Sequence, residues 1–206
     1  VLRDNVWGPQ EEDAVRRDLT VNALYYDAGS FEVFDHVQGM RDLERRSICV
    51  IGEPALRFTE DPVRMLRVLR FAAKLGFRID PATARAFLLA EVEALEPFAF
   101  VLVSPAGKPL HVIEVARSES GGLEVRVPGR PRVVPELSVP VRTSLRDRGF
   151  KSEDAADPTL PWVRAVDDAA AAVELVHELL TAVFEEKPDV ALDIAHASHR
   201  AEHEAQ

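Results

Sequence analysis

Two groups of arginine and acidic residues have the types and spacing to bind a ligand. The first is Arg16, Arg17 and Asp18, and the second is Glu60, Asp61, Arg64 and Arg67. A guanidinium donates a planar fork of hydrogen bonds that fits a phosphate or a carboxylate, and a neighbouring carboxylate adds acceptors in fixed directions. Such a pair can hold a phosphate or read the edge of a nucleobase, although either group taken alone is more often an ordinary surface ion pair.

The first group precedes a pattern typical of a β-hairpin. The apolar and aromatic residues of 21–26 and 31–36 predict two strands, with Gly29 available for the turn between them. Arg16, Arg17 and Asp18 are therefore expected where a strand begins.

The second group opens a predicted helix over residues 60–75, which Gly76 ends. Glu60 and Asp61 would occupy its first turn, where acidic residues favour the helix dipole. Asp61 would then share a face with Arg64 and could pair with it. Four apolar residues of this region are predicted to be core: Leu66, Leu69, Phe71 and Phe77.

After a further predicted helix that begins near residue 80, the pattern changes. The expected elements are strands at 97–104, 110–118 and 122–128, a short helix at 140–148, an irregular loop at 149–165 and a long amphipathic helix at 166–186. Trp162 is expected to pack under that helix, and the residues from 195 onward form a polar tail. The predicted fold class is α+β in two parts, 1–90 and 97–195, followed by a tail at 196–206.

Composition limits the kinds of protein that this chain can be. The 206 residues are 47% hydrophobic and 29% charged, which suits a folded protein with a core. No apolar run reaches the length of a membrane helix, and Cys49 stands alone, so a cytoplasmic location is expected. The net charge of −10 is uneven, since residues 1–90 carry a net −1 and residues 91–206 a net −9. The second part is therefore a poor candidate for binding a phosphate backbone.

Three motifs in order carry a resemblance to a known family. RRDLTVNALYYD, FDHVQGMRDL and IGEPALRFTEDPVRMLRVLRFAAKLGF together resemble the class II nucleotidyltransferases, which are the bacterial poly(A) polymerases and the CCA-adding tRNA enzymes. The resemblance covers about residues 4–90, and the spelling is closer to the poly(A) polymerases.

The resemblance implies a role for each group of residues. Arg17, with Arg16 beside it, would face the triphosphate of ATP, Asp18 the ribose hydroxyls, and Asn22 belongs to the same motif. The residues that would read the incoming base are Glu60, Asp61 and Arg64, with Arg67 nearby. A loop motif that couples the nucleotide site to domain movement would comprise Asp35, Gly39, Asp42 and Leu43. The 3′ end of an RNA is the second ligand that the family implies.

The family's magnesium ligands have no counterpart in this sequence. In the family, two aspartates of a DxD motif upstream of the RRD motif hold the metal, and neither that motif nor the glycine-rich segment before it is found here. Because nucleotidyl transfer needs metal ions to neutralise charge, this chain alone is predicted not to add nucleotides and has no predicted catalytic residue.

Residues 97–195 resemble a different family. The run LRDRGFKSEDAADPTLPWVRAVDDAAAAVELVHELLTAVF is similar to type III secretion chaperone-like domains of the YbjN-like kind. This resemblance implies a module that binds a protein partner. The alternative function is therefore a protein-binding chaperone-like module with a vestigial nucleotidyltransferase segment. His196, His199 and His203 could share a helical face and hold a metal, but a solvated tail is the favoured interpretation.

Overall fold

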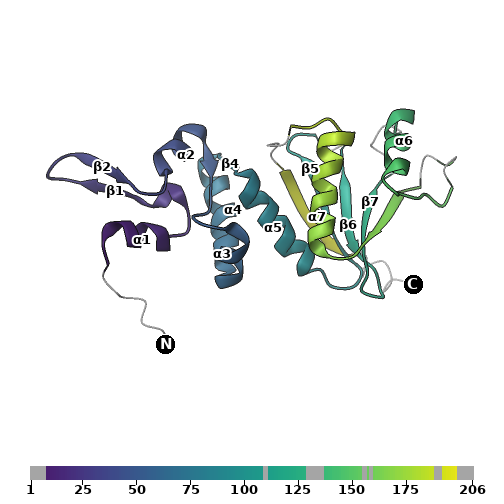
Figure 1. Cartoon of the computed structure of the whole chain (residues 1–206), viewed down its shortest axis with the longest axis horizontal. Helices are drawn as coiled ribbons and strands as arrows, with labels where there is room; N and C mark the ends of the chain where they lie inside the picture. Colours follow the sequence, from purple (N-terminus) through teal and green to yellow (C-terminus); the bar gives the residue numbers. More distant parts are fainter. Residues whose placement is uncertain are drawn as a thin grey trace. The chain divides into compact units, whose positions relative to one another are not determined.

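The computed structural model describes residues 8–108, 111–128, 137–154, 157, 160–187 and 192–198. The chain divides into two compact units, Val1–Phe87 and Leu88–Gln206 (Figure 1). Both units combine helices and strands, which confirms the predicted mixed fold class. Within the described ranges, no helix is both long enough and apolar enough to span a membrane.

The first unit begins with a short helix and a hairpin. Helix α1 (Gln10–Arg16) leads through a 3-10 turn, η1 (Thr20–Asn22), to the antiparallel strands β1 (Leu24–Asp27) and β2 (Glu32–Asp35). The predicted hairpin is confirmed, but its first strand begins only at Leu24. Arg17 and Asp18 therefore follow a helix and do not open a strand, because residues 20–22 form the turn.

Short helices and strands complete the first unit. They are α2 (Gly39–Arg45), β3 (Ser47–Ile48), α3 (Pro54–Glu60), α4 (Val63–Leu75) and β4 (Arg78–Ile79), and then α5 (Pro81–Glu93), which continues into the second unit. Strand β3 pairs in parallel with β4. Gly76 ends α4 in the left-handed conformation with φ 64°, as predicted.

Pro62 divides the predicted 60–75 helix into two. The residue before a proline avoids the helical conformation because the ring clashes with its backbone, and Asp61 is extended with φ −152° and ψ 99°. Glu60 is therefore the last residue of α3, and the prediction that Glu60 and Asp61 lie in the first turn of one helix is wrong. The Asp61 carboxylate instead accepts a hydrogen bond from the backbone N–H of Val63 at 3.0 Å.

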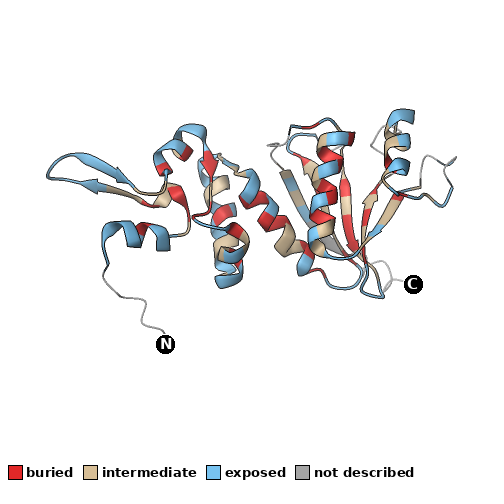
Figure 2. Ribbon diagram, viewed as in Figure 1, coloured by how far each residue is buried: buried red, intermediate tan, exposed pale blue. Residues whose placement is uncertain are grey.

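The apolar residues of α4 are less buried than expected. Val68 is its one fully buried residue, whereas Leu66 is 67% and Leu69 42% exposed (Figure 2). Phe71 and Phe77 are half-buried. The prediction that all four residues are core is therefore wrong for the leucines, because the described part of the first unit provides no layer to cover that face of α4.

The second unit is built on one antiparallel sheet. Its strands, in the order β8-β7-β6-β5-β9, are β8 (Trp162–Val166), β7 (Leu123–Val127), β6 (Ile113–Arg117), β5 (Ala99–Pro105) and β9 (Leu192–Ser198). Burial alternates along β5 and β7, so one face of the sheet points into the core. The three predicted strands are β5, β6 and β7 and are confirmed. Residues 162–165 of β8 were expected to be loop, and residues 195–198 of β9 were expected to be tail.

Helices cover the buried face of that sheet. They are the end of α5, then α6 (Val139–Asp147), α7 (Ala169–Glu178) and a π-helical turn, η2 (Leu179–Val183). Helix α6 confirms the prediction for 140–148, and the 166–186 helix is shorter than predicted because β8 occupies its first residue. Trp162 is 5% exposed within the cluster, which confirms its place in the core.

Candidate functional site

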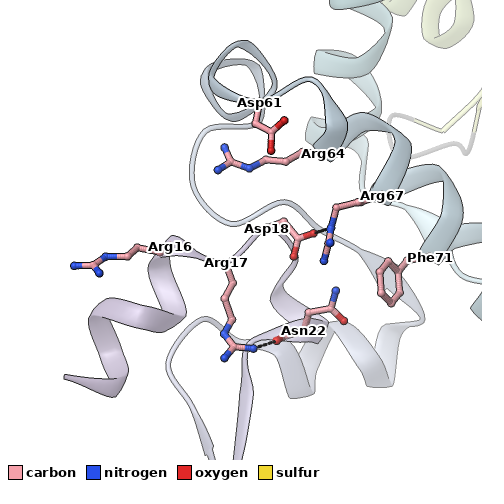
Figure 3. Close-up of a pocket in the computed structure, with 8 residues that line it drawn as sticks. All are labelled: Arg16, Arg17, Asp18, Asn22, Asp61, Arg64, Arg67 and Phe71. Atoms are coloured by element: carbon pink, nitrogen blue, oxygen red, sulfur yellow. Dashed lines mark hydrogen bonds and ion pairs between the residues drawn. The ribbon is translucent and has the colours of Figure 1, made fainter. Parts of the chain in front are cut away.

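A hollow of about 560 Å³ lies in the first unit, between the segment that follows α1 and the first turns of α4 (Figure 3). Its lining residues are Arg16, Arg17, Asp18, Asn22, Asp61, Arg64, Arg67 and Phe71. Four arginines stand against two aspartates, so the lining has a net positive charge. The hollow thus brings together residues of both sequence groups, with Glu60 as the one predicted nucleotide-binding residue outside it.

Backbone pairing holds the Asp18 segment in place. Leu19 is fully buried and pairs with Val50. The Asp18 carbonyl accepts a hydrogen bond from the Ile51 N–H at 2.9 Å, and Thr20 donates its N–H to the Cys49 carbonyl at 3.1 Å. These hydrogen bonds hold the backbone on both sides of Leu19, and the Asp18 side chain then reaches Arg67 of α4.

The Asp18 carboxylate links this segment to α4. It accepts hydrogen bonds from the Leu19 N–H at 2.9 Å and from Arg67 Nε. Figure 3 shows Asp18 and Arg67 between the Asp61–Arg64 side of the hollow and the Arg17–Asn22 side. The Asp18–Arg67 ion pair therefore lies between these two sides of the hollow.

Arg17 is oriented by three neighbours. Its Nε and Nη2 donate to Asp13 Oδ2 at 3.2 and 3.0 Å, its Nη1 donates to the Asn22 carbonyl at 2.9 Å, and its guanidinium lies 4.9 Å from the centre of the Tyr25 ring. The Tyr25 hydroxyl also donates to Asp13, at 2.7 Å. The hydrogen bond from Tyr25 and then that from Arg17 hold the pKa of Asp13 below its ordinary value. Asp13 thus stays ionised and fixes Arg17 in one orientation.

Glu60 pairs with arginines and does not line the hollow. Its Oε2 accepts hydrogen bonds from Arg64 Nη1 and Arg57 Nη1, each at 2.8 Å. The hydrogen bond from Arg64 is the main reason why the pKa of Glu60 lies below its ordinary value. The expected Asp61–Arg64 pair is therefore replaced by a Glu60–Arg64 pair, because Pro62 places Glu60 at the end of α3.

Asp35 organises the predicted loop motif through backbone hydrogen bonds. Asp35 accepts hydrogen bonds from the N–H groups of Val37, Gly39 and Met40 at 3.2, 2.9 and 3.0 Å. Burial opposes ionisation of Asp35, but these donors lower its pKa.

The same loop also contacts Thr20. Thr20 Oγ1 donates to the buried Asp42 carboxylate at 2.8 Å. A Cβ at Gly39 would lie 2.3 Å from the Thr20 carbonyl oxygen, so this approach requires glycine. The loop is therefore held against the segment that carries Asp18. Leu43, the last residue of the predicted motif, is half-buried.

Three residues near the hollow were not predicted as part of a site. They are Asp13, Arg57 and Phe71. The spacing of four residues between Asp13 and Arg17 would have revealed their contact had helix α1 been predicted. Phe71 was assigned to the core, and the contacts of Arg57 with the Arg16 and Arg17 carbonyls have no local signal because they join residues 41 and 40 positions apart.

The residues of the hollow do not fit a magnesium ion. Its two carboxylates, Asp18 and Asp61, stand among four arginines, and Asp18 already pairs with Arg67, so the surroundings favour an anion over a divalent cation. Across the described ranges, no group of three or more His, Cys, Asp or Glu residues could hold a metal. His196 lies in strand β9, contrary to a helical arrangement, and His199 and His203 lie outside the described residues.

Comparison with known proteins finds similarity over the first unit. Residues 5–49 match the family described as the Poly A polymerase head domain. Poly(A) polymerase I of Escherichia coli is 60% identical over 84 residues, which are 41% of this chain and 18% of that protein. The CCA-adding enzyme of Bacillus pumilus is 49% identical over 76 residues, which are 37% of this chain and 19% of that enzyme.

A solved structure is also similar. The Bacillus stearothermophilus CCA-adding enzyme in complex with CTP is 34% identical, with a TM-score of 0.40, over 45% of this chain and 24% of that one. The chain spans less than a fifth of the length of the two curated relatives. Over the matched residues, the first unit of this chain is therefore similar to class II nucleotidyltransferases, the family of the poly(A) polymerases and CCA-adding enzymes.

Proposed function

We propose that the first unit binds a nucleoside triphosphate, ATP in the first place, in the hollow of about 560 Å³. The observation that carries the proposal is that residues from both sequence groups, all but Glu60, line this one hollow and give it a net positive charge. Relatives of this chain are a poly(A) polymerase and CCA-adding enzymes, and solved CCA-adding enzymes hold CTP or ATP.

Arg17 is the residue best prepared to receive the triphosphate. A guanidinium has five N–H donors, and three of those of Arg17 bond to Asp13 and the Asn22 carbonyl. Its Nη1 and Nη2 each carry a second N–H, and a pair of donors in this geometry suits two phosphate oxygens. Because its orientation is fixed before binding, Arg17 loses little side-chain freedom when it engages the ligand.

The opposite side of the hollow would receive the nucleoside. Arg64 is held by Glu60 Oε2 and the Arg57 carbonyl and lies beside Asp61, so donors and an acceptor are available for a base edge. Asp18 would accept from the ribose hydroxyls. The half-buried ring of Phe71 adds an apolar surface on which a base can stack.

The 3′ end of an RNA is the proposed second ligand, since a CCA-adding enzyme of Thermotoga maritima has been solved with tRNA. We infer that the chain by itself binds ATP without adding nucleotides. Magnesium-dependent incorporation of AMP by the purified chain, with host enzymes excluded, would contradict this inference.

The test of the proposal is an ATP titration of the purified chain by isothermal calorimetry. Arg64→Ala is expected to weaken ATP binding about tenfold, because one charge-assisted contact is lost. Arg45→Ala, which removes an exposed arginine of α2 outside the hollow, is the matched control and should leave the affinity unchanged. If the unaltered chain does not bind ATP, or if Arg64→Ala binds it equally well, the proposed site is wrong.

The second candidate function is the protein-binding module expected for the second unit. The observation that favours it is that β9 lies at one end of the sheet and, among the described strands, pairs with β5 alone. An edge strand can pair with an extended segment of a partner. A folded chain that shows no response to ATP would favour this candidate over nucleotide binding. The chaperone-like resemblance and the cytoplasmic location stay predictions.

A further inference from the structure

Arg57 makes contacts that join the two sides of the hollow. Its Nη2 donates to the carbonyl oxygens of Arg16 and Arg17 at 3.0 and 2.8 Å. Its Nη1 donates to Glu60 at 2.8 Å, and its own carbonyl accepts a hydrogen bond from Arg64 Nη1 at 2.9 Å. The Arg17 peptide and the Arg64 side chain are thus both attached to one residue of α3.

The guanidinium of Arg57 is largely removed from water. Its side chain is 15% exposed, and its Nε is buried without a hydrogen-bond partner in the part of the chain that the structure describes. A buried cation is stable only while its acceptors stay in place. The position of Arg57 is therefore set by the Arg16 and Arg17 carbonyls and by Glu60. Arg57 in turn sets the distance between those carbonyls and the Glu60 carboxylate.

The chemistry of this contact favours arginine over lysine. Helix α1 ends at Arg16, where backbone carbonyls lack partners within the helix and where a positive charge is favourable. A planar guanidinium can serve two carbonyls with one nitrogen and a carboxylate with another. A lysine ammonium could supply the charge but not this flat arrangement.

We propose that Arg57 is a positioning residue of the nucleotide site. It holds the Arg17 segment, which faces the phosphates, and Arg64, which faces the base, at one fixed separation. Arg57 does not itself line the hollow, so it acts through these neighbours. This inference rests on the proposed binding of a nucleoside triphosphate.

The experiment measures the Kd of two ligands, ATP and inorganic tripolyphosphate, by isothermal calorimetry. Arg57→Ala is expected to weaken both ligands about tenfold, equivalent to about 1.4 kcal/mol, because both sides of the hollow lose their anchor. Arg64→Ala should weaken ATP but leave tripolyphosphate unchanged. Arg57→Lys should lie between Arg57→Ala and the unaltered chain, and Arg45→Ala should match the unaltered chain for both ligands.

Chemical rescue separates positioning from general destabilisation. Millimolar guanidinium chloride can occupy the space left in Arg57→Ala, and is expected to restore most of its affinity for ATP without changing that of the unaltered chain. Should Arg57→Ala fail to fold, Arg57→Lys decides the question, since a folded lysine variant with weaker binding of both ligands supports the proposal.

The outcomes separate this inference from the function on which it rests. If the unaltered chain binds ATP and the folded Arg57 variants bind both ligands equally well, Arg57 has no positioning role but the nucleotide site stands. A loss confined to ATP would also overturn the inference, because Arg57 would then support the base side alone. If the unaltered chain binds neither ligand, both proposals fail.

Discussion

The two units of this chain are held together in different ways. In the second unit one large apolar cluster joins the sheet to α5, α6 and α7. In the first unit the buried apolar residues include Leu19, Ile48, Phe58 and Val68, besides a small cluster of Ala14, Ala23 and Ile51. Among the described residues, the exposed large apolar side chains all lie in the first unit apart from Phe98 and Val139.

In the first unit, directional polar contacts join the helices and loops alongside this apolar burial. Arg57 ties α3 to the end of α1, Asp42 ties α2 to Thr20, and Arg67 ties α4 to Asp18. Such contacts depend on direction and distance, whereas apolar burial depends mainly on area. The first unit should therefore be sensitive to changes in backbone and polar groups, and the second unit to cavities.

The largest effect is expected from Leu179→Ala in the second unit. Leu179 is fully buried in the apolar cluster, and truncating it leaves a cavity that should lower the free energy of unfolding by about 3 kcal/mol. Urea denaturation followed by Trp162 fluorescence, in a Trp7→Phe background, measures the loss. A change below about 1 kcal/mol would contradict the cavity-sensitive description of this unit.

The next largest effect is expected from Gly39→Ala in the first unit. The new Cβ would lie 2.3 Å from the Thr20 carbonyl oxygen, so α2 must move away at a cost of about 2 kcal/mol. Faster hydrogen exchange at Thr20 and Asp42 measures this change. Gly29→Ala is the matched control, because its Cβ meets only the end of the Asp27 side chain, at 3.3 Å. Equal effects of the two substitutions would count against a locked loop.

A smaller, pH-dependent effect is expected at Glu186. Hydrogen bonds from Lys108 at 2.8 and 2.9 Å, and then from His111 at 3.1 Å, lower the pKa of this carboxylate. A lowered folded-state pKa gives stability that is present above the unfolded value, about 4.3, and lost as pH falls through the folded value. Thermal melts of the second unit should show this loss, and Glu186→Gln should remove it. An unchanged pH profile in that variant would refute the assignment.

The smallest effect is expected from Leu66→Ala. Leu66 is 67% exposed on α4, so its truncation should change the free energy of unfolding by less than about 0.5 kcal/mol. Set beside Leu179→Ala, this substitution compares the same chemical change in the two units. A loss as large as that of Leu179 would show that Leu66 is covered when the protein is in solution.

Local patterns predicted the elements whose signals lie within a few residues. The β1–β2 hairpin, the end of α4 at Gly76, helix α6 and strands β5 to β7 are of this kind. Strand β9 was missed because its partner, β5, lies far earlier in the chain and its own residues alternate weakly. Strand β8 was missed because proline and acidic residues precede it and suggested a loop.

The sequence by itself determined which two groups are proposed to bind the ligand, because the order and spacing of RRD and EDPVR identify them without any coordinates. It also contained the reason for the break before α4, since Pro62 forces Asp61 out of the helix. Only the tertiary structure decided that Glu60 pairs with Arg57 and Arg64 and does not face the hollow. Contacts such as that of Arg57 with the Arg17 carbonyl join residues 40 positions apart, and no local pattern encodes such a distance.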